Sequence, residues 1–127
     1  MGFYYIIIRS YFSAAHRLTD FLGDEEIHGH NYLVEVFIKE EDIEKKGYQF
    51  DFREVEKYLK SILPEHKFLN EIFDFLPTCE NVAKYLFYKI KEKYPIKKLD
   101  YGKMKNMLAN MKKTLLDFSK IFIKIIN

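Results

Sequence analysis

The hydrophobic pattern of this chain begins with two stretches that read as β-strands. Residues Phe3 to Ala15 are rich in tyrosine, isoleucine and phenylalanine and contain neither proline nor glycine. The second stretch, His30 to Glu40, is apolar at every second position, at Tyr32, Val34, Val36 and Ile38. Both features are typical of strands. The segment between them, Thr19 to Glu26, contains a glycine and three consecutive acids. We therefore expect an antiparallel hairpin joined by an acidic loop.

A helical pattern follows a second loop through Lys45, Lys46 and Gly47. Asp51 is a candidate N-cap, and Pro64 is the expected stop. Between them, apolar residues recur at helical spacing: Phe52, Val55, Tyr58, Leu59 and Ile62.

A second helix is predicted to begin at the N-cap candidate Thr78 and to end before Pro95. One face of it carries the apolar residues Val82, Tyr85, Leu86 and Ile90. The intervening residues, Glu65 to Pro77, read as an irregular connector. The predicted order to this point is strand, strand, helix, helix.

The C-terminal segment carries two overlapping patterns. A stripe at helical spacing consists of Met104, Met107, Leu108, Met111, Leu115 and Phe122. Ile121, Ile123 and Ile125 alternate instead, as in a strand. Taken alone, the pattern favours a helix.

Composition and charge narrow the class of protein. With 127 residues, 48% of them hydrophobic and 31% charged, the chain fits one globular α+β domain. The net charge is only +2 with both signs interspersed, so no nucleic-acid partner is expected. The single cysteine, Cys79, has no partner within the chain for a disulfide, and neither a signal peptide nor a membrane span is recognised. These features predict a cytoplasmic protein that does not enter membranes.

Three histidines form a candidate metal site. His28 and His30 are two residues apart at the start of a predicted strand, so both imidazoles point to one face. His16 ends the first strand, beside His28 if the strands pair. Three imidazoles with one open position are typical of a catalytic zinc site. Imidazole ligation suits Zn²⁺ best, with Fe, Ni or Cu as alternatives, and an exposed His-x-His pair without metal is the plainer interpretation of the spacing alone.

Five short motifs surround these histidines or follow them along the chain. They are FSAAHRL at 12–18, HGHNY at 28–32, Asp51-Phe52, EHKFLN at 65–70 and PTCENVA at 77–83. In this order they resemble motifs of the 6-pyruvoyl-tetrahydropterin synthase and 6-carboxytetrahydropterin synthase family, and the first two are similar to the family's two zinc motifs. The resemblance covers about residues 3 to 95.

The resemblance implies a tunnelling fold, an antiparallel β-sheet with two helices packed on one face in the order β-β-α-α-β-β. It also implies a homo-oligomer, a trimer or hexamer with active sites between subunits. The implied zinc ligands are His16, His28 and His30. The implied acid–base histidine is His66, with Glu65 in place of the usual aspartate. By itself, His66 reads as a surface histidine after a helix.

The segment that helps hold the pterin ring in the family falls on Thr78, Cys79 and Glu80. Cys79 stands where the family has serine or threonine, so we expect a small packed residue there.

Two departures from the family pattern affect the expected reaction. The family's basic cysteine, a few residues before His-Gly-His, is missing, and Asp24 and Glu25 are the candidates for a second base. The plainer interpretation of these acids is a solvated loop. A branch of the family with glutamate at this place cleaves the side chain of dihydroneopterin to give 6-hydroxymethyl-dihydropterin.

The second departure is at the C-terminus, where the family has two strands and a glutamate that anchors the pterin. This chain has no glutamate after Glu92. Under one permitted choice of codons, Leu99 to Thr114 read one base earlier give a string beginning I-R-L-W-E, which resembles that hairpin. We therefore divide the chain into a pterin synthase-like domain, 1–98, and a departing segment, 99–127, in which a shifted reading frame is the hypothesis that the coding DNA tests.

The sequence thus predicts a zinc-dependent lyase that acts on the side chain of 7,8-dihydroneopterin or its triphosphate. The alternative is a non-catalytic member of the same fold that binds a pterin or a metal.

Overall fold

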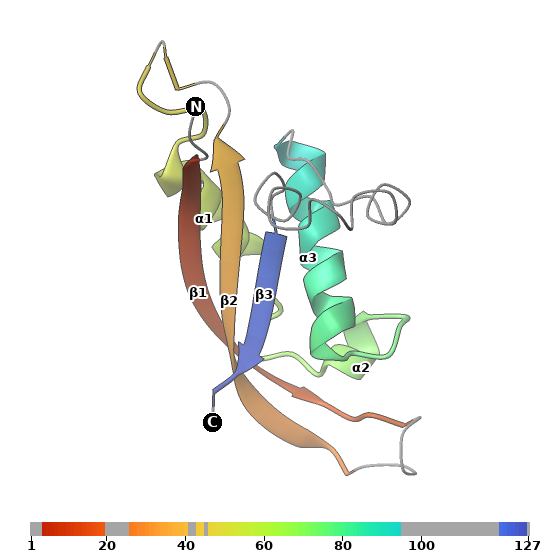
Figure 1. The fold of residues 1–127 in the computed structure, drawn as a ribbon. Coiled ribbons are helices and arrows are strands. Elements are labelled where there is room, and N and C mark those ends of the chain that lie inside the picture. The colour runs from red at the N-terminus through yellow and green to blue at the C-terminus, as the bar shows by residue number, and fades with distance from the viewer. Residues whose placement is uncertain (1–3, 20–25, 41–42, 45, 95–119, 127) are drawn as a thin grey trace, which may run out of the picture.

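The computed structural model describes residues 4–19, 26–40, 43–44, 46–94 and 120–126. Three strands form one antiparallel sheet in the order β1 (Tyr4–His16), β2 (His28–Glu40) and β3 (Lys120–Ile125). The helices are α1 (Phe52–Ile62), the short α2 (Leu69–Ile72) and α3 (Cys79–Lys93). The helices lie on one side of the sheet, where α1 packs against β1 and α3 against β3 (Figure 1). The predicted antiparallel sheet with helices on one face is confirmed.

The two long strands pair along their whole length. In the register, Ile8 lies opposite Val36, Phe12 opposite Tyr32, and His16 opposite His28. Because side chains alternate between the two faces of a sheet, even-numbered residues of both strands point to the helices. These residues supply most of the sheet's part of the core: Ile8, Phe12, Ala14, Tyr32, Val34, Val36 and Ile38. The helices complete it with Val55, Leu59, Leu69, Val82, Leu86 and Ile90.

Local capping explains where the two long helices start. The Asp51 side chain accepts a hydrogen bond from the Arg53 N–H at 3.0 Å, and Thr78 Oγ1 accepts one from the Asn81 N–H at 3.2 Å. Both predicted N-caps are therefore confirmed. The loop before α1 turns at Gly47, whose φ of 84° is a conformation that glycine adopts without a Cβ clash.

The sequence prediction was wrong in two places. The segment expected to be an irregular connector contains α2, a single turn with Leu69 buried in the core. Phe122, which the helical stripe included, lies in strand β3, where Ile121 and Ile123 face the helices instead. The segment is extended there because the edge of β2 that β1 leaves open offers backbone hydrogen bonds to a strand.

Most of the remaining C-terminal segment lies outside the described residues. This holds for residues 95–119, and so for the start of the segment 99–127, for the earlier of the two expected terminal strands and for most of the helical stripe. The division at residue 98 and the shifted reading frame stay predictions.

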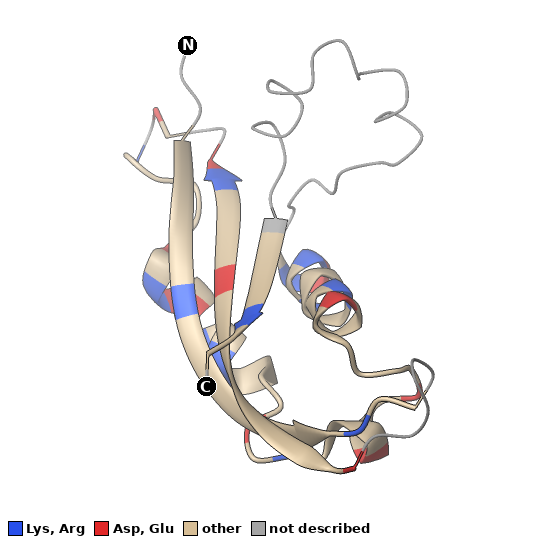
Figure 2. Cartoon of the chain, turned by 60° about the horizontal axis from the view of Figure 1, so that its bottom comes forward, with Lys and Arg blue, Asp and Glu red and all other residues tan. Residues whose placement is uncertain are grey.

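The other face of the sheet, which the helices do not cover, is apolar in part. We call it the open face; it carries the odd-numbered residues of β1 and β2 together with Phe122 of β3. On it, the exposed fractions are 55% for Ile7, 61% for Tyr11 and 52% for Phe122. Charges of both signs are interspersed over the described helices and strands (Figure 2). No helix among the described residues combines the length and the apolar character needed to cross a membrane.

A buried carboxylate ties the end of β2 to the loop before α1. Glu40 is 6% exposed and accepts hydrogen bonds from the backbone N–H groups of Gln49 at 2.8 Å and of Phe50 at 3.2 Å. We expect Glu40→Ala to lower the free energy of unfolding by about 2 kcal/mol, because both donors lose their acceptor. The midpoint and slope of urea unfolding measure this loss.

Glu35→Ala is the matched control, because its carboxylate pairs with Arg9 on the exposed surface. We expect it to lower the free energy of unfolding by less than about 1 kcal/mol. Equal losses in the two variants would contradict a special role for Glu40.

Candidate metal centre

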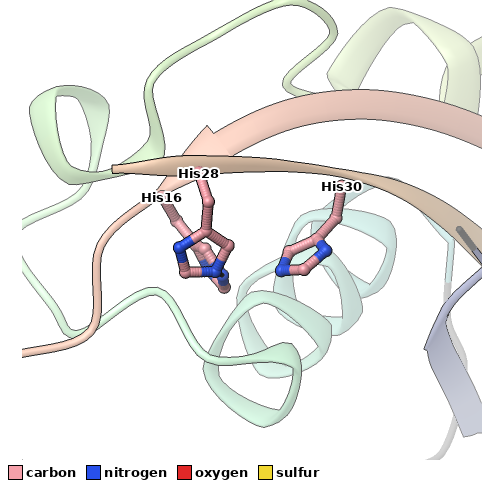
Figure 3. Close-up of side chains that lie close together, drawn as sticks. All are labelled: His16, His28 and His30. Atoms are coloured by element: carbon pink, nitrogen blue, oxygen red, sulfur yellow. Dashed lines mark hydrogen bonds between the residues drawn. The ribbon is translucent and has the colours of Figure 1, made fainter. Parts of the chain in front are cut away.

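Three imidazoles meet at the end of the hairpin on the helix-covered face. His16 lies opposite His28 in the register, and His30 lies opposite Ala14. All three occupy even-numbered positions and so share the face of the core, as Figure 3 shows. Each ring offers one nitrogen, and these three nitrogens lie within 4.8 Å of one another. The structure therefore brings together the three ligands that the spacing predicted.

Hydrogen bonds set the orientation of two of these rings. His16 Nδ1 lies 2.9 Å from the carbonyl oxygen of Pro77, and His28 Nδ1 lies 2.9 Å from that of Glu26. A carbonyl oxygen only accepts, so each Nδ1 carries the hydrogen and each neutral ring keeps its lone pair on Nε2. The ring tautomers of both histidines follow from these contacts.

The two lone pairs then face each other. His16 Nε2 and His28 Nε2 are 3.0 Å apart. Two acceptors at this distance repel unless a cation lies between them. Nitrogen ligands of one tetrahedral ion with bonds of 2.0–2.1 Å are separated by about 3.3 Å. The donor set therefore fits a divalent metal ion, and His16, His28 and His30 are the residues that would hold it.

Aromatic side chains close the inner wall of the centre. Phe12 and Tyr32 stack across the two strands, with ring centroids 4.6 Å apart. The hydroxyl of Tyr32 lies 3.4 Å from His16 Nδ1. Burial, with a smaller effect of Cys79, raises the pKa of Tyr32 to about 12, so this phenol stays neutral beside the imidazoles. His16 is only 3% exposed, so this ligand is shielded from solvent.

A second group of polar residues lies at the free edge of β1. The N–H of His66 donates to the Ser13 carbonyl at 2.7 Å, and the Lys67 carbonyl accepts from the Ala15 N–H at 2.9 Å. Glu65 accepts from the Ser13 N–H at 3.1 Å with one oxygen and pairs with His66 Nε2 at 2.8 Å with the other. These contacts fasten Glu65 and His66 to the strand that carries His16.

His66 has the backbone conformation of a glycine. Its φ of 56° is left-handed, which costs a non-glycine residue roughly 1 kcal/mol or more. The Ser13 carbonyl holds this conformation, and the imidazole remains 79% exposed. Strain of this kind in an exposed histidine paired with a carboxylate points to a functional role.

His66 also borders an open hollow of about 460 Å³. Its other lining residues include the odd-numbered strand residues Ser13, Ala15 and Asn31, whose side chains point away from the three imidazoles. The lining also includes His30, one of the three clustered histidines. His66 and one histidine of the metal centre therefore line the same hollow within one chain.

Comparison with known proteins assigns the family. The sequence profile described as 6-pyruvoyl tetrahydropterin synthase matches residues 5–110. The chain belongs to the 6-pyruvoyl tetrahydropterin synthase family. The resemblance that the motifs suggested is thereby confirmed.

Relatives in the family carry different names. The chain is 37% identical over 94 residues to the dihydroneopterin monophosphate aldolase of Pyrococcus furiosus, covering 71% of this chain and 77% of that protein. It is 32% identical to the putative 6-carboxy-5,6,7,8-tetrahydropterin synthase of Archaeoglobus fulgidus, covering 68% and 75%.

Solved structures agree on the fold. The Caenorhabditis elegans 6-pyruvoyl tetrahydropterin synthase superposes with a TM-score of 0.61 at 30% identity, over 72% of this chain and 79% of that one. The Plasmodium falciparum 6-pyruvoyl tetrahydropterin synthase has a TM-score of 0.64 at 16% identity, over 99% and 100%. At this low identity, the second likeness shows the fold alone.

The start of α3 carries the predicted pterin-binding residues and abuts the metal centre through Pro77. Thr78 caps the helix, Glu80 is exposed, and Cys79 packs against the core. Burial, and to a lesser degree Glu80, raises the pKa of the Cys79 thiol, so it is protonated at neutral pH. A thiol in this state does not replace the family's basic cysteine.

Two of the predicted site residues cannot be placed, because the candidate second bases Asp24 and Glu25 lie outside the described residues. Tyr32 and the carbonyls of Pro77 and Glu26 have contacts to the imidazoles that sequence reasoning missed. A backbone carbonyl leaves no signal in the sequence, whereas Tyr32 lies within the HGHNY motif and at an apolar position of the predicted strand.

Metal binding tests the geometry of the three imidazoles directly. We expect the metal-free full chain to bind one divalent ion and to gain about 2.7 kcal/mol of stability when the free ion is 100-fold above its Kd. His28→Ala should abolish this gain, since it removes one of three ligands. Elemental analysis and unfolding with and without metal measure both effects.

His66→Ala is the control, because this histidine borders the hollow and does not belong to the cluster of three. It should keep the bound ion. Loss of metal in His66→Ala, or its retention in His28→Ala, would show that the three imidazoles are not the ligands.

Proposed function

We propose that this chain is a zinc-dependent lyase acting on the side chain of 7,8-dihydroneopterin or one of its phosphate esters. The observation that carries the proposal is the set of three imidazoles whose nitrogens lie within 4.8 Å of one another, together with a strained His66 paired to Glu65. Zinc suits three imidazole ligands with a further position open to substrate.

We place the residues in the following roles. His16, His28 and His30 hold the ion, and Thr78, Cys79 and Glu80 border the pterin ring. His66 is the acid–base residue, and Asp24 or Glu25 supplies the second base. A bound Zn²⁺ would act as a Lewis acid for the vicinal oxygens of the side chain, favouring loss of their protons.

Glu65 determines which nitrogen of His66 is the base. Its carboxylate lies 2.8 Å from Nε2, so Nε2 carries the hydrogen and Nδ1 keeps the lone pair. The same carboxylate stabilises the imidazolium that forms after proton transfer. We call Glu65 and His66 the dyad. Because the Ser13 N–H donates to the other oxygen of Glu65, the dyad keeps a fixed direction relative to β1.

The proposed outcome is cleavage between the first two side-chain carbons, giving 6-hydroxymethyl-dihydropterin. The base takes the proton of the second carbon's hydroxyl, and that carbon becomes the aldehyde of the released fragment. The electron pair of the broken bond passes to the first carbon and the ring imine. A proton returned to the first carbon completes the product. The 37% identity to a protein named dihydroneopterin monophosphate aldolase supports this outcome.

The second candidate function is a non-catalytic pterin- or metal-binding protein. It is favoured by the two departures in the sequence, the missing cysteine before His28 and the missing glutamate after Glu92. A metal-loaded chain that binds pterins but turns over none of them would support it.

Product analysis tests the lyase proposal. The zinc-loaded full chain should convert dihydroneopterin, its monophosphate or its triphosphate to 6-hydroxymethyl-dihydropterin, detected by mass spectrometry. His66→Ala should lower kcat by roughly 10²- to 10⁴-fold while keeping its zinc, because it removes the proton-transfer group. Glu65→Gln should lower kcat less.

Glu71→Gln, an exposed glutamate on α2, is the matched control and should leave kcat unchanged. Formation of a 6-pyruvoyl or 6-carboxy product instead would overturn the proposed outcome. Full activity in His66→Ala would overturn the role of the dyad.

We further propose that two chains complete each active site, in a homo-oligomer of three or six chains. His66 lies at the free edge of β1, and the open face exposes Ile7, Tyr11 and Phe122. Apolar side chains gathered on one face are typical of an interaction surface.

Mixing of inactive variants tests this sharing. His16→Ala and His66→Ala should each be inactive alone, but co-refolded together they should recover about a quarter of the wild-type activity, because random assembly pairs an intact triad with an intact His66 at that frequency. The control is a co-refolded mixture of His16→Ala with His28→Ala, which should stay inactive. Absence of recovery with His66→Ala would mean that each site lies within one chain.

A further inference from the structure

A tight turn in front of α3 presents the carbonyl that orients His16. The Thr78 N–H donates to the Leu76 carbonyl at 2.8 Å, a hydrogen bond between residues i and i+2 that defines a γ-turn around Pro77. Proline suits the central position of this γ-turn because its φ is fixed and it has no N–H to satisfy. The carbonyl of Pro77 is left for His16 Nδ1, at 2.9 Å.

Asn81, in the first turn of α3, fastens both ends of this γ-turn. Its side-chain Nδ2 donates to the Leu76 carbonyl at 2.9 Å. Its backbone N–H donates to Thr78 Oγ1 at 3.2 Å. Leu76 and Thr78, the residues on either side of Pro77, are therefore both hydrogen-bonded to Asn81. These two hydrogen bonds hold the turn and with it the direction of the Pro77 carbonyl.

The His16 imidazole, which the Pro77 carbonyl contacts, is tightly enclosed by its neighbours. His16 is 3% exposed and sits edge-on to His28 and His30, with ring centroids 4.7 and 5.1 Å away. With Nδ1–H bonded to the Pro77 carbonyl, its Nε2 points toward His28 Nε2, 3.0 Å away. The partner of a ligand's second nitrogen fixes its tautomer and orientation and affects metal affinity.

We propose that Asn81 is a positioning residue for the metal ligand His16, acting through the Leu76–Thr78 turn. The inference rests on the proposed metal site but not on the reaction it serves. It joins the start of α3, where the pterin is proposed to bind, to the geometry of the metal ligands. Asn81 itself touches none of the three imidazoles through any described contact.

Two substitutions separate positioning from helix stability. Asn81→Ala removes the amide. Asn81→Asp keeps the shape but turns an acceptor toward the Leu76 carbonyl, while a negative charge in the first turn favours the helix itself. A purely structural role predicts that only Asn81→Ala is harmful, whereas a positioning role predicts that both variants bind metal more weakly.

The matched control is Asp51→Ala, which removes a comparable N-cap from α1. It destabilises a helix of the same domain without touching the Leu76–Thr78 turn. Zn²⁺ affinity is measured on metal-free full chain by competition with a chromogenic chelator. The visible spectrum of the Co²⁺-loaded protein and the ¹⁵N shifts of the metal-free His16 ring report ligand geometry and tautomer.

We expect both Asn81 variants to bind Zn²⁺ roughly tenfold more weakly, the lower end of losses seen when the partner of a ligand is removed. Their Co²⁺ spectra and His16 shifts should change, and Asp51→Ala should match the wild type in all three. Wild-type affinity in Asn81→Asp, or an equal loss in Asp51→Ala, would overturn the inference. A wild-type chain that binds no divalent ion would overturn both the inference and the proposed metal site.

Discussion

The register between β1 and β2 is the constraint on which the rest of the structure depends. It places His16 opposite His28 and puts three imidazoles on one face of the hairpin. A slip by one residue would turn His28 and His30 to the open face, because side chains alternate along a strand. The core prevents that slip, since the same even-numbered positions bury Phe12 against Tyr32. Folding and metal-site geometry therefore have a common cause.

Two segments that follow α1 contact the end of this hairpin, one at the edge of β1 and one on the helix-covered face. One stretch runs beside the end of β1, where Asn70 pairs with both backbone groups of Arg17 at 2.8 and 2.7 Å and where Glu65 and His66 are fastened. The next stretch turns at Pro77 and reaches His16 from the helix side. The result is a metal centre on the helix-covered face and an exposed Glu65–His66 pair at the free edge of β1, with His30 and His66 both lining the hollow between them.

Membership of the family does not decide the reaction, because relatives of similar identity carry the names of an aldolase and of a carboxypterin synthase. The difference between such outcomes lies in which groups move protons around the side chain. This chain keeps the histidine but has neither the family's basic cysteine nor its late glutamate. The half-buried thiol of Cys79 does not compensate, because its pKa is raised. The chemistry is therefore proposed from the residues that remain.

The sequence by itself determined the features that depend on short-range pattern. Strand-forming residue types predicted the first long strand, alternation predicted the second, and capping residues predicted the starts of α1 and α3. His-Gly-His predicted two rings on one face because a strand has a period of two. Tertiary structure alone decided the rest. It turned Phe122 into a strand residue by offering it the edge of β2, and it brought the carbonyl of Pro77 to His16. Such contacts depend on the path of the chain through space. Because every residue has the same backbone carbonyl, residue type alone cannot predict them.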